Sequence, residues 1–110
     1  SLSLVGNAAQ KVLNGYHVDK AIFSCKGIDM QEGMTDSNEL DSDIKNAMYA
    51  CADTAILAVD SSKFDKVSFV KSMRLKKGDI LVTDKSPSKE WKIFLQEHGV
   101  ELLCPKEQKN

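Results

Sequence analysis

The stretch TAILAVDSSKF, at residues 54–64, decides the fold of this chain. Six small or branched residues come first, and four polar residues, 60–63, follow them abruptly. A short apolar run without alternation is typical of a strand buried on both faces, as in parallel sheets covered by helices. Because ligands bind outside the carboxyl ends of such strands, we expect a ligand-binding edge formed by Asp60, Ser61, Ser62 and Lys63. The same residues also fit a solvated turn in which Asp60 caps its own backbone.

The other segments alternate between strand and helix patterns. Apolar runs predict strands at 20–24, 79–83 and 100–104, alternation predicts a short edge strand at 67–73, and residues 1–5 resemble the end of a strand. Apolar residues at helical spacing predict helices at 7–14, 37–52 and 87–97. Strands that alternate with helices are typical of a parallel sheet with crossover helices. We therefore predict an α/β fold, with a mostly parallel sheet and flanking helices.

A glycine-punctuated segment, residues 25–35, separates the first of these strands from the long helix. Gly27 and Gly33 predict a loop that needs unusual backbone angles. The loop leaves the carboxyl end of a strand, so its polar residues, among them Asp29 and Thr35, are candidates for ligand contact. The alternative is a surface turn in which Asp29 bonds its own backbone.

The composition excludes several classes of protein. A length of 110 residues suffices for one small domain. The 15 basic and 16 acidic residues give a net charge of −1, which leaves no basic face for nucleic acid. No apolar run approaches the roughly 20 residues of a membrane span, and no secretory signal is visible.

The cysteines and histidines are scattered along the chain. The chain has an odd number of cysteines, Cys25, Cys51 and Cys104, and no two of them have CxxC spacing. We therefore expect buried free thiols in a reducing cytosol. His17 and His98 are isolated, whereas a zinc site needs clustered ligands. We therefore expect no metal site and no cofactor.

Taken together, these segments resemble the effector-binding domain of DeoR-type bacterial transcriptional repressors. The matching motifs, in chain order, are DKAIF (19–23), GID (27–29), GMT (33–35), the helix with Lys45 and Met48, DSSKF (60–64) and ILVTD (80–84). Their order and spacing fit over nearly the whole chain. The DSSKF motif after an apolar strand is the most specific of them.

The resemblance implies a fold shared with sugar-phosphate isomerases, glucosamine-phosphate deaminases and coenzyme A transferases. It also implies binding of a phosphorylated sugar or related metabolite, which alters the affinity of a repressor for its operator. By position, the ligand-binding residues are Lys63 at the phosphate, with help from the Ser62 hydroxyl, Asp29, Gly33 and Thr35 along the sugar, and Asp60 shaping the turn. We expect a cytoplasmic homo-oligomer.

Two departures from the family pattern bear on this hypothesis. The family usually has a small residue, often Gly, after the Lys-Phe pair, whereas this chain has Asp65, an acid that would weaken the attraction of Lys63 for an anion. The winged helix-turn-helix and a Gly-Thr-Thr-type phosphate loop of the family both precede the point where this sequence starts. We therefore interpret residues 1–110 as a partial C-terminal sensor domain, which meets operator DNA only through the missing N-terminal domain.

Two other functions fit the same fold. An isomerase or deaminase needs a carboxylate or histidine as a base. Asp29 and Glu32 are candidates, but no histidine stands near either loop, which favours sensing over catalysis. An oligomerisation domain that has lost ligand binding is the third alternative.

Overall fold

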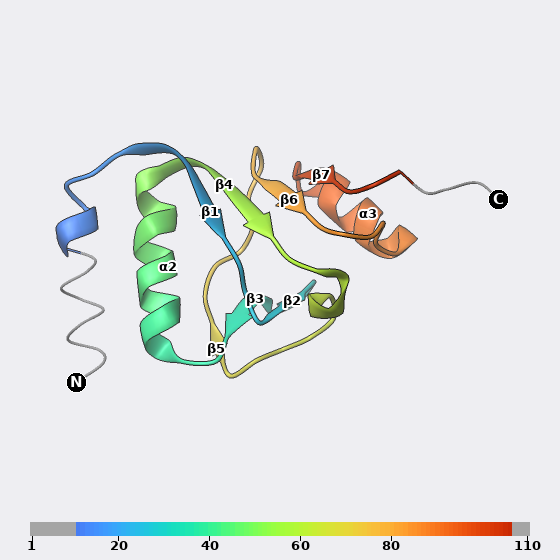
Figure 1. Cartoon of the computed structure of the whole chain (residues 1–110), viewed down its shortest axis with the longest axis horizontal. Coiled ribbons are helices and arrows are strands. Elements are labelled where there is room, and N and C mark those ends of the chain that lie inside the picture. The colour runs from blue at the N-terminus through green and yellow to red at the C-terminus, as the bar shows by residue number, and fades with distance from the viewer. Residues whose placement is uncertain (1–10, 107–110) are drawn as a thin grey trace.

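The computed structural model describes residues 11–106, which form two sheets flanked by helices (Figure 1). The larger sheet is parallel throughout and has the order β1 (Val18–Phe23), β4 (Ala52–Ala58), β6 (Ile80–Val82), β7 (Glu101–Leu103). The smaller sheet is antiparallel and has the order β2 (Gly27–Asp29), β3 (Gly33–Asp36), β5 (Val70–Lys71). The main helices are α2 (Glu39–Cys51) and α3 (Lys89–Glu97). The predicted α/β fold with a mostly parallel sheet is confirmed.

The four strands that the sequence predicts for the parallel sheet are all present, with ends shifted by at most two residues. Both helices begin at polar caps: Asn38 accepts the Asp41 N–H at 2.9 Å, and Ser88 accepts the Trp91 N–H at 3.2 Å. Of the helix predicted at 7–14, residues 11–13 are helical. The rest of it up to residue 10, and the strand end at 1–5, lie outside the described residues.

The loop predicted at residues 25–35 is wrong, because this segment contains the antiparallel hairpin of β2 and β3. Each strand is too short to leave a periodic pattern in the sequence. Their pairing is completed by a distant segment, β5, which adds to β3 and confirms the edge strand predicted within residues 67–73. Gly33 has the unusual backbone angle that the sequence predicts, a φ of +76°.

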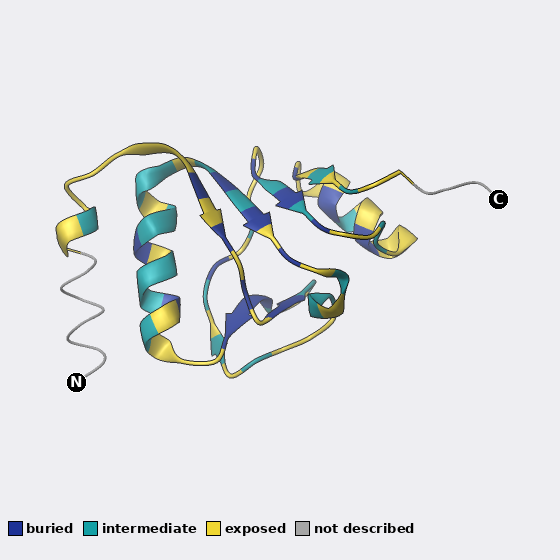
Figure 2. Cartoon of the chain, in the orientation of Figure 1, coloured by how far each residue is buried: buried dark blue, intermediate teal, exposed yellow. Residues whose placement is uncertain are grey.

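Along β1 and β4, buried residues alternate with residues that are more exposed (Figure 2). In β4, Ala55 and Leu57 are buried, but Ile56 between them is only half-buried. In β1, which is an edge strand of the described sheet, Ile22 is 68% exposed. The prediction of strands buried on both faces is therefore wrong for β1 and only partly right for β4.

The core joins both sheets to α3. Trp91, which is 1% exposed, packs edge-on against Phe64 with ring centroids 5.0 Å apart. It belongs to the same buried cluster as Leu57 and Leu81 of the central strands. No helix among residues 11–106 has the length and apolar character needed to cross a membrane.

Candidate functional site

The polar turn after β4 is built by its own side chains. Asp60 precedes a short 3-10 helix, Ser61–Lys63, and its Oδ1 atom accepts hydrogen bonds from the Ser62 N–H (2.9 Å) and the Ser62 hydroxyl. The bond from the hydroxyl is the main interaction that lowers the pKa of Asp60. The backbone N–H groups of Ser61 and Lys63 are also used, by Asp84 Oδ1 (2.6 Å) and by the Asp60 carbonyl (3.1 Å). The Lys63 side chain is therefore the positively charged group of this turn that remains to bind an anion.

Lys63 lines a cavity of about 390 Å³ at the carboxyl ends of β1 and β4. Ser24, Cys25 and Lys26 follow β1 there, as the polar turn follows β4. The lining residues are Ser24, Cys25, Lys26, Asp36, Asp41, Lys45, Ala58, Val59, Asp60 and Lys63. Within the described residues, neither Lys26 nor Lys63 forms an ion pair. Both cations are thus available to an anionic ligand.

Asp36 and Lys45 form the buried ionic part of this cavity. Asp36 ends β3 and is 1% exposed, and its Oδ1 atom accepts a hydrogen bond from Lys45 Nζ of α2 at 2.5 Å. Neither residue is predicted from the sequence as a cavity-lining group. The sequence indicates their role only weakly, because Lys45 lies outside the apolar stripe of its helix, where a residue is normally solvated.

The three candidates from the hairpin are Asp29, Gly33 and Thr35. The Asp29 carboxylate accepts the backbone N–H groups of Gln31 and Glu32, both at 2.9 Å, so it closes the turn between β2 and β3. Thr35 is fully buried, and its hydroxyl joins the backbones of Gly27 (3.4 Å) and Ser68 (2.8 Å). None of the three lines the cavity at Lys63, which contains Asp60 from the predicted set.

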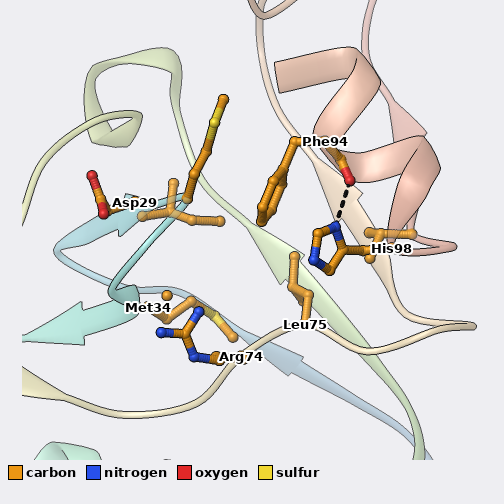
Figure 3. A pocket seen from close by; sticks show the side chains of 10 residues that line it. Asp29, Met34, Arg74, Leu75, Phe94 and His98 are labelled. Atoms are coloured by element: carbon orange, nitrogen blue, oxygen red, sulfur yellow. Dashed lines mark hydrogen bonds between the residues drawn. The ribbon is translucent and has the colours of Figure 1, made fainter. Parts of the chain in front are cut away.

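Asp29 and Gly33 instead border a second, smaller cavity of about 80 Å³ between the hairpin and α3 (Figure 3). Its walls are mostly apolar, with Met34, Leu75 and Phe94 among them. Figure 3 shows the Asp29 carboxylate directed away from Phe94 and His98, which form the opposite side. The predicted site residues are therefore divided between two places in the fold.

Cys25 is the one thiol that lines the larger cavity. Burial, reinforced by the negative charge of Asp36, raises the pKa of the Cys25 thiol to about 11. A thiol with this pKa stays protonated at neutral pH and is a poor nucleophile. All three cysteines are free, as predicted, although Cys51 and Cys104 are only half-buried.

One group of possible metal ligands arises only through the fold. The parallel pairing of β1 and β4 brings His17, Asp19 and Asp53 together, with their ligand atoms within 4.8 Å of one another. The hydrogen bond between His17 Nε2 and Asp53 Oδ1, at 2.8 Å, raises the pKa of His17. All three residues are exposed, and nothing else among the described residues points to a ligand at this place.

The sequence matches known transcriptional regulators. It is 42% identical over 84 residues to the HTH-type transcriptional regulator YulB of Bacillus subtilis, a match that covers 76% of this chain and 33% of the relative. It is 30% identical to the L-fucose operon activator of Haemophilus influenzae, over 86% of this chain and 38% of the relative. It is 32% identical to the deoxyribose operon repressor of Escherichia coli K12, over 86% of this chain and 37% of the relative.

These matches span about a third of the relatives' lengths, between 33% and 38% in the three cases. The family model of the DeoR C terminal sensor domain matches residues 1–85, which include the hairpin, α2, the polar turn and β6. The matched region thus contains every residue that lines the larger cavity. The chain belongs to the DeoR family of transcriptional regulators, as a sensor domain of that family.

Proposed function

We propose that this chain binds a phosphorylated sugar or a related metabolite, and that binding changes the operator affinity of the regulator that contains it. The proposal rests chiefly on Lys63, an unpaired cation among the described residues, at the edge of a polar cavity where a parallel sheet ends. The relatives support a sugar ligand, since two of them are named for the L-fucose and deoxyribose operons.

In this proposal Lys63 holds the anionic group of the ligand. Two carboxylates hold the turn that carries Lys63: Asp84 accepts the Ser61 N–H and Asp60 accepts the Ser62 N–H. The base of the Lys63 side chain therefore needs little ordering when a ligand binds. Lys26 adds a second positive charge on the β1 side of the same cavity. Asp65 does not compete directly for Lys63, because its Oδ1 atom accepts a hydrogen bond from Trp91 Nε1 at 3.0 Å.

The test is a calorimetric titration of the full-length protein with inorganic phosphate and with pentose and hexose phosphates. A hydrogen bond to a charged group contributes about 1.5–3 kcal/mol, so Lys63→Ala should weaken binding roughly 10- to 150-fold. Lys63→Arg should recover only part of the loss, because a planar guanidinium does not replace a point charge. Lys66→Ala is the matched control, since Lys66 is an exposed lysine near the turn that does not line the cavity. Equal affinities of wild type and Lys63→Ala would contradict the proposal.

The two alternatives predict different results. An isomerase or deaminase of this fold would turn over sugar phosphates, and the family relatives favour regulation instead. A pure oligomerisation domain would show no rise in its thermal midpoint with any sugar phosphate, whereas a ligand that binds the native state raises it.

A further inference from the structure

One atom of the larger cavity has an unmet hydrogen-bonding capacity. Asp36 Oδ2 is buried and has no hydrogen-bond partner among the described residues, although Oδ1 of the same carboxylate is bound to Lys45 Nζ. Nearly all buried polar atoms in native proteins have a partner. Because the residue Asp36 lines the larger cavity, the missing partner of this buried oxygen points to a hydrogen-bond donor from outside the chain.

The position of Asp36 is fixed from two sides. Its backbone is the last position of β3 and pairs with Val70 of β5, and its Oδ1 atom is held by Lys45 from α2. The side chain of Asp36 is only 2% exposed and that of Lys45 is 21% exposed. The pair is thus a preformed feature of the cavity rather than a mobile surface contact.

The charge of Asp36 restricts what its free oxygen can bind. A carboxylate repels the anionic group that Lys63 attracts, and it accepts hydrogen bonds but donates none. The group that satisfies Oδ2 must therefore be a donor, and a hydroxyl is the donor that a sugar offers in quantity. The cavity then has a cationic end at Lys63 and an accepting end at Asp36.

We propose that Asp36 Oδ2 accepts a hydrogen bond from a hydroxyl group of the ligand, so that the cavity selects polyhydroxy compounds carrying an anionic group over simple anions. This inference rests on the proposed function, because it assigns the second end of the same site. Lys45 is a positioning residue here: it holds the carboxylate through Oδ1 and leaves Oδ2 for the ligand.

The experiment compares two substitutions, each of which replaces an aspartate by asparagine and so removes one negative charge. Asp36→Asn keeps the shape of the side chain but places an amide where the ligand needs a charged acceptor. Asp43→Asn is the matched control, because Asp43 also lies on α2 but does not line the cavity. The full-length wild type and both variants are titrated calorimetrically with inorganic phosphate and with pentose and hexose phosphates.

For the sugar phosphate that wild type binds most tightly, we expect Asp36→Asn to lose about 10- to 100-fold in affinity. Its affinity for inorganic phosphate should stay the same or rise, since a negative charge is gone. Asp43→Asn should retain the wild-type affinity for both ligands. Three outcomes would each overturn the inference. Asp36→Asn could bind the sugar phosphate as tightly as wild type does, or it could lose affinity for the sugar phosphate and for inorganic phosphate to the same extent. The third is that wild type binds no sugar phosphate more tightly than inorganic phosphate.

A second measurement keeps the inference testable if Asp36→Asn fails to fold. Wild type is titrated with deoxy analogues of its best sugar phosphate, each of which lacks one hydroxyl. One analogue should bind at least about tenfold more weakly, and if none does, the inference is wrong. Failure of the proposed function differs, because Lys63→Ala would then leave the affinity for phosphate unchanged.

Discussion

Gly27 lies where two stretches of backbone come so close together that no side chain fits between them. A Cβ atom at Gly27 would lie 2.3 Å from the carbonyl oxygen of Lys66. This contact is to backbone, so no side-chain rotation relieves it. The glycine therefore lets the segment after the polar turn pass directly over β2, and it is needed for packing rather than for ligand contact.

We expect Gly27→Ala to destabilise the protein by about 1–3 kcal/mol, because the backbone at Lys66 must shift to admit the methyl group. Gly15→Ala is the control, since the nearest atom to its Cβ, the Val12 carbonyl oxygen, lies at an ordinary 3.6 Å. Urea unfolding measures both. A loss of stability at Gly15 as large as that at Gly27 would contradict the explanation.

Asp65 stands directly after the Lys63-Phe64 pair, and its backbone has an unusual conformation. Its φ of +62° lies in the left-handed region, which favours Gly and tolerates Asp and Asn better than most side chains. Its N–H donates to the Ile28 carbonyl at 2.8 Å, and its carboxylate accepts the Trp91 indole N–H at 3.0 Å. The acid thus links the polar turn to β2 and α3.

Asp65→Ala should cost about 1–3 kcal/mol of unfolding free energy, from the lost hydrogen bond and from left-handed strain in alanine. Asp65→Asn should cost clearly less, because asparagine tolerates this conformation and keeps an acceptor oxygen for Trp91. Thermal and urea unfolding of the two variants decide between these expectations. Equal losses would show that neither the backbone angle nor the indole contact matters.

At the scale of elements, Asp79 joins α2 to the parallel sheet. It is 1% exposed, and its carboxylate accepts hydrogen bonds from Tyr49 Oη (2.6 Å), the Ala55 N–H (3.1 Å) and the Lys76 N–H (3.0 Å). Burial by itself raises the pKa of Asp79, but these hydrogen bonds outweigh it and lower the pKa below the ordinary value of 3.8. The helix, the central strand and the turn before β6 therefore meet at one carboxylate.

This network predicts a specific pH dependence. A carboxylate whose pKa is lowered by folding stabilises the native state above its unfolded pKa, and this stabilisation is lost as the pH falls through the folded pKa. Asp79→Asn should cost about 1.5–3 kcal/mol near neutral pH. The difference in unfolding free energy between wild type and Asp79→Asn should narrow as the pH falls below 3.8. Urea unfolding from about pH 7 to about pH 3 measures it.

The exposed acid Glu101 of β7 provides the control. Glu101→Gln should leave both the stability at neutral pH and its dependence on pH close to those of wild type. A gap between wild type and Asp79→Asn that stayed constant over the whole pH range would show that the Asp79 hydrogen bonds do not depend on its charge.

For the whole molecule, charge balance sets the expectation for DNA. The chain has 15 basic and 16 acidic residues, and several lysines face acids within the fold, among them Lys45 with Asp36 and Lys71 with Glu32. Strong contact with DNA needs a surface on which several cations face the phosphates. The net charge of −1 provides no such excess.

We therefore predict that the 110-residue chain alone gives no sequence-specific shift of operator DNA in a gel assay at physiological salt. The full-length protein on the same DNA is the positive control. A specific shift with the isolated chain would contradict this prediction and would place DNA recognition in the sensor domain itself.

The parallel sheet, the two main helices and the polar turn could all be predicted from the sequence alone. These features follow from local periodicity and from abrupt changes of polarity, as at residues 59–60, and such signals need only neighbours along the chain. The family resemblance was likewise readable from short motifs such as DSSKF. The sequence did not predict that the candidate site residues would be divided. Asp29 and Thr35 form hydrogen bonds that hold the hairpin and its neighbours, whereas Lys63 lines the larger cavity.

Which side chains meet depends on contacts between segments that are distant in the sequence. The β2–β3 hairpin depends on a two-residue strand from far downstream, and the cavity at Lys63 depends on β1 lying next to β4. The pairing of Asp36 with Lys45 likewise requires the end of β3 to face one side of α2. Strand order and the packing of a helix on a sheet arise from contacts between distant segments, and no local pattern encodes them.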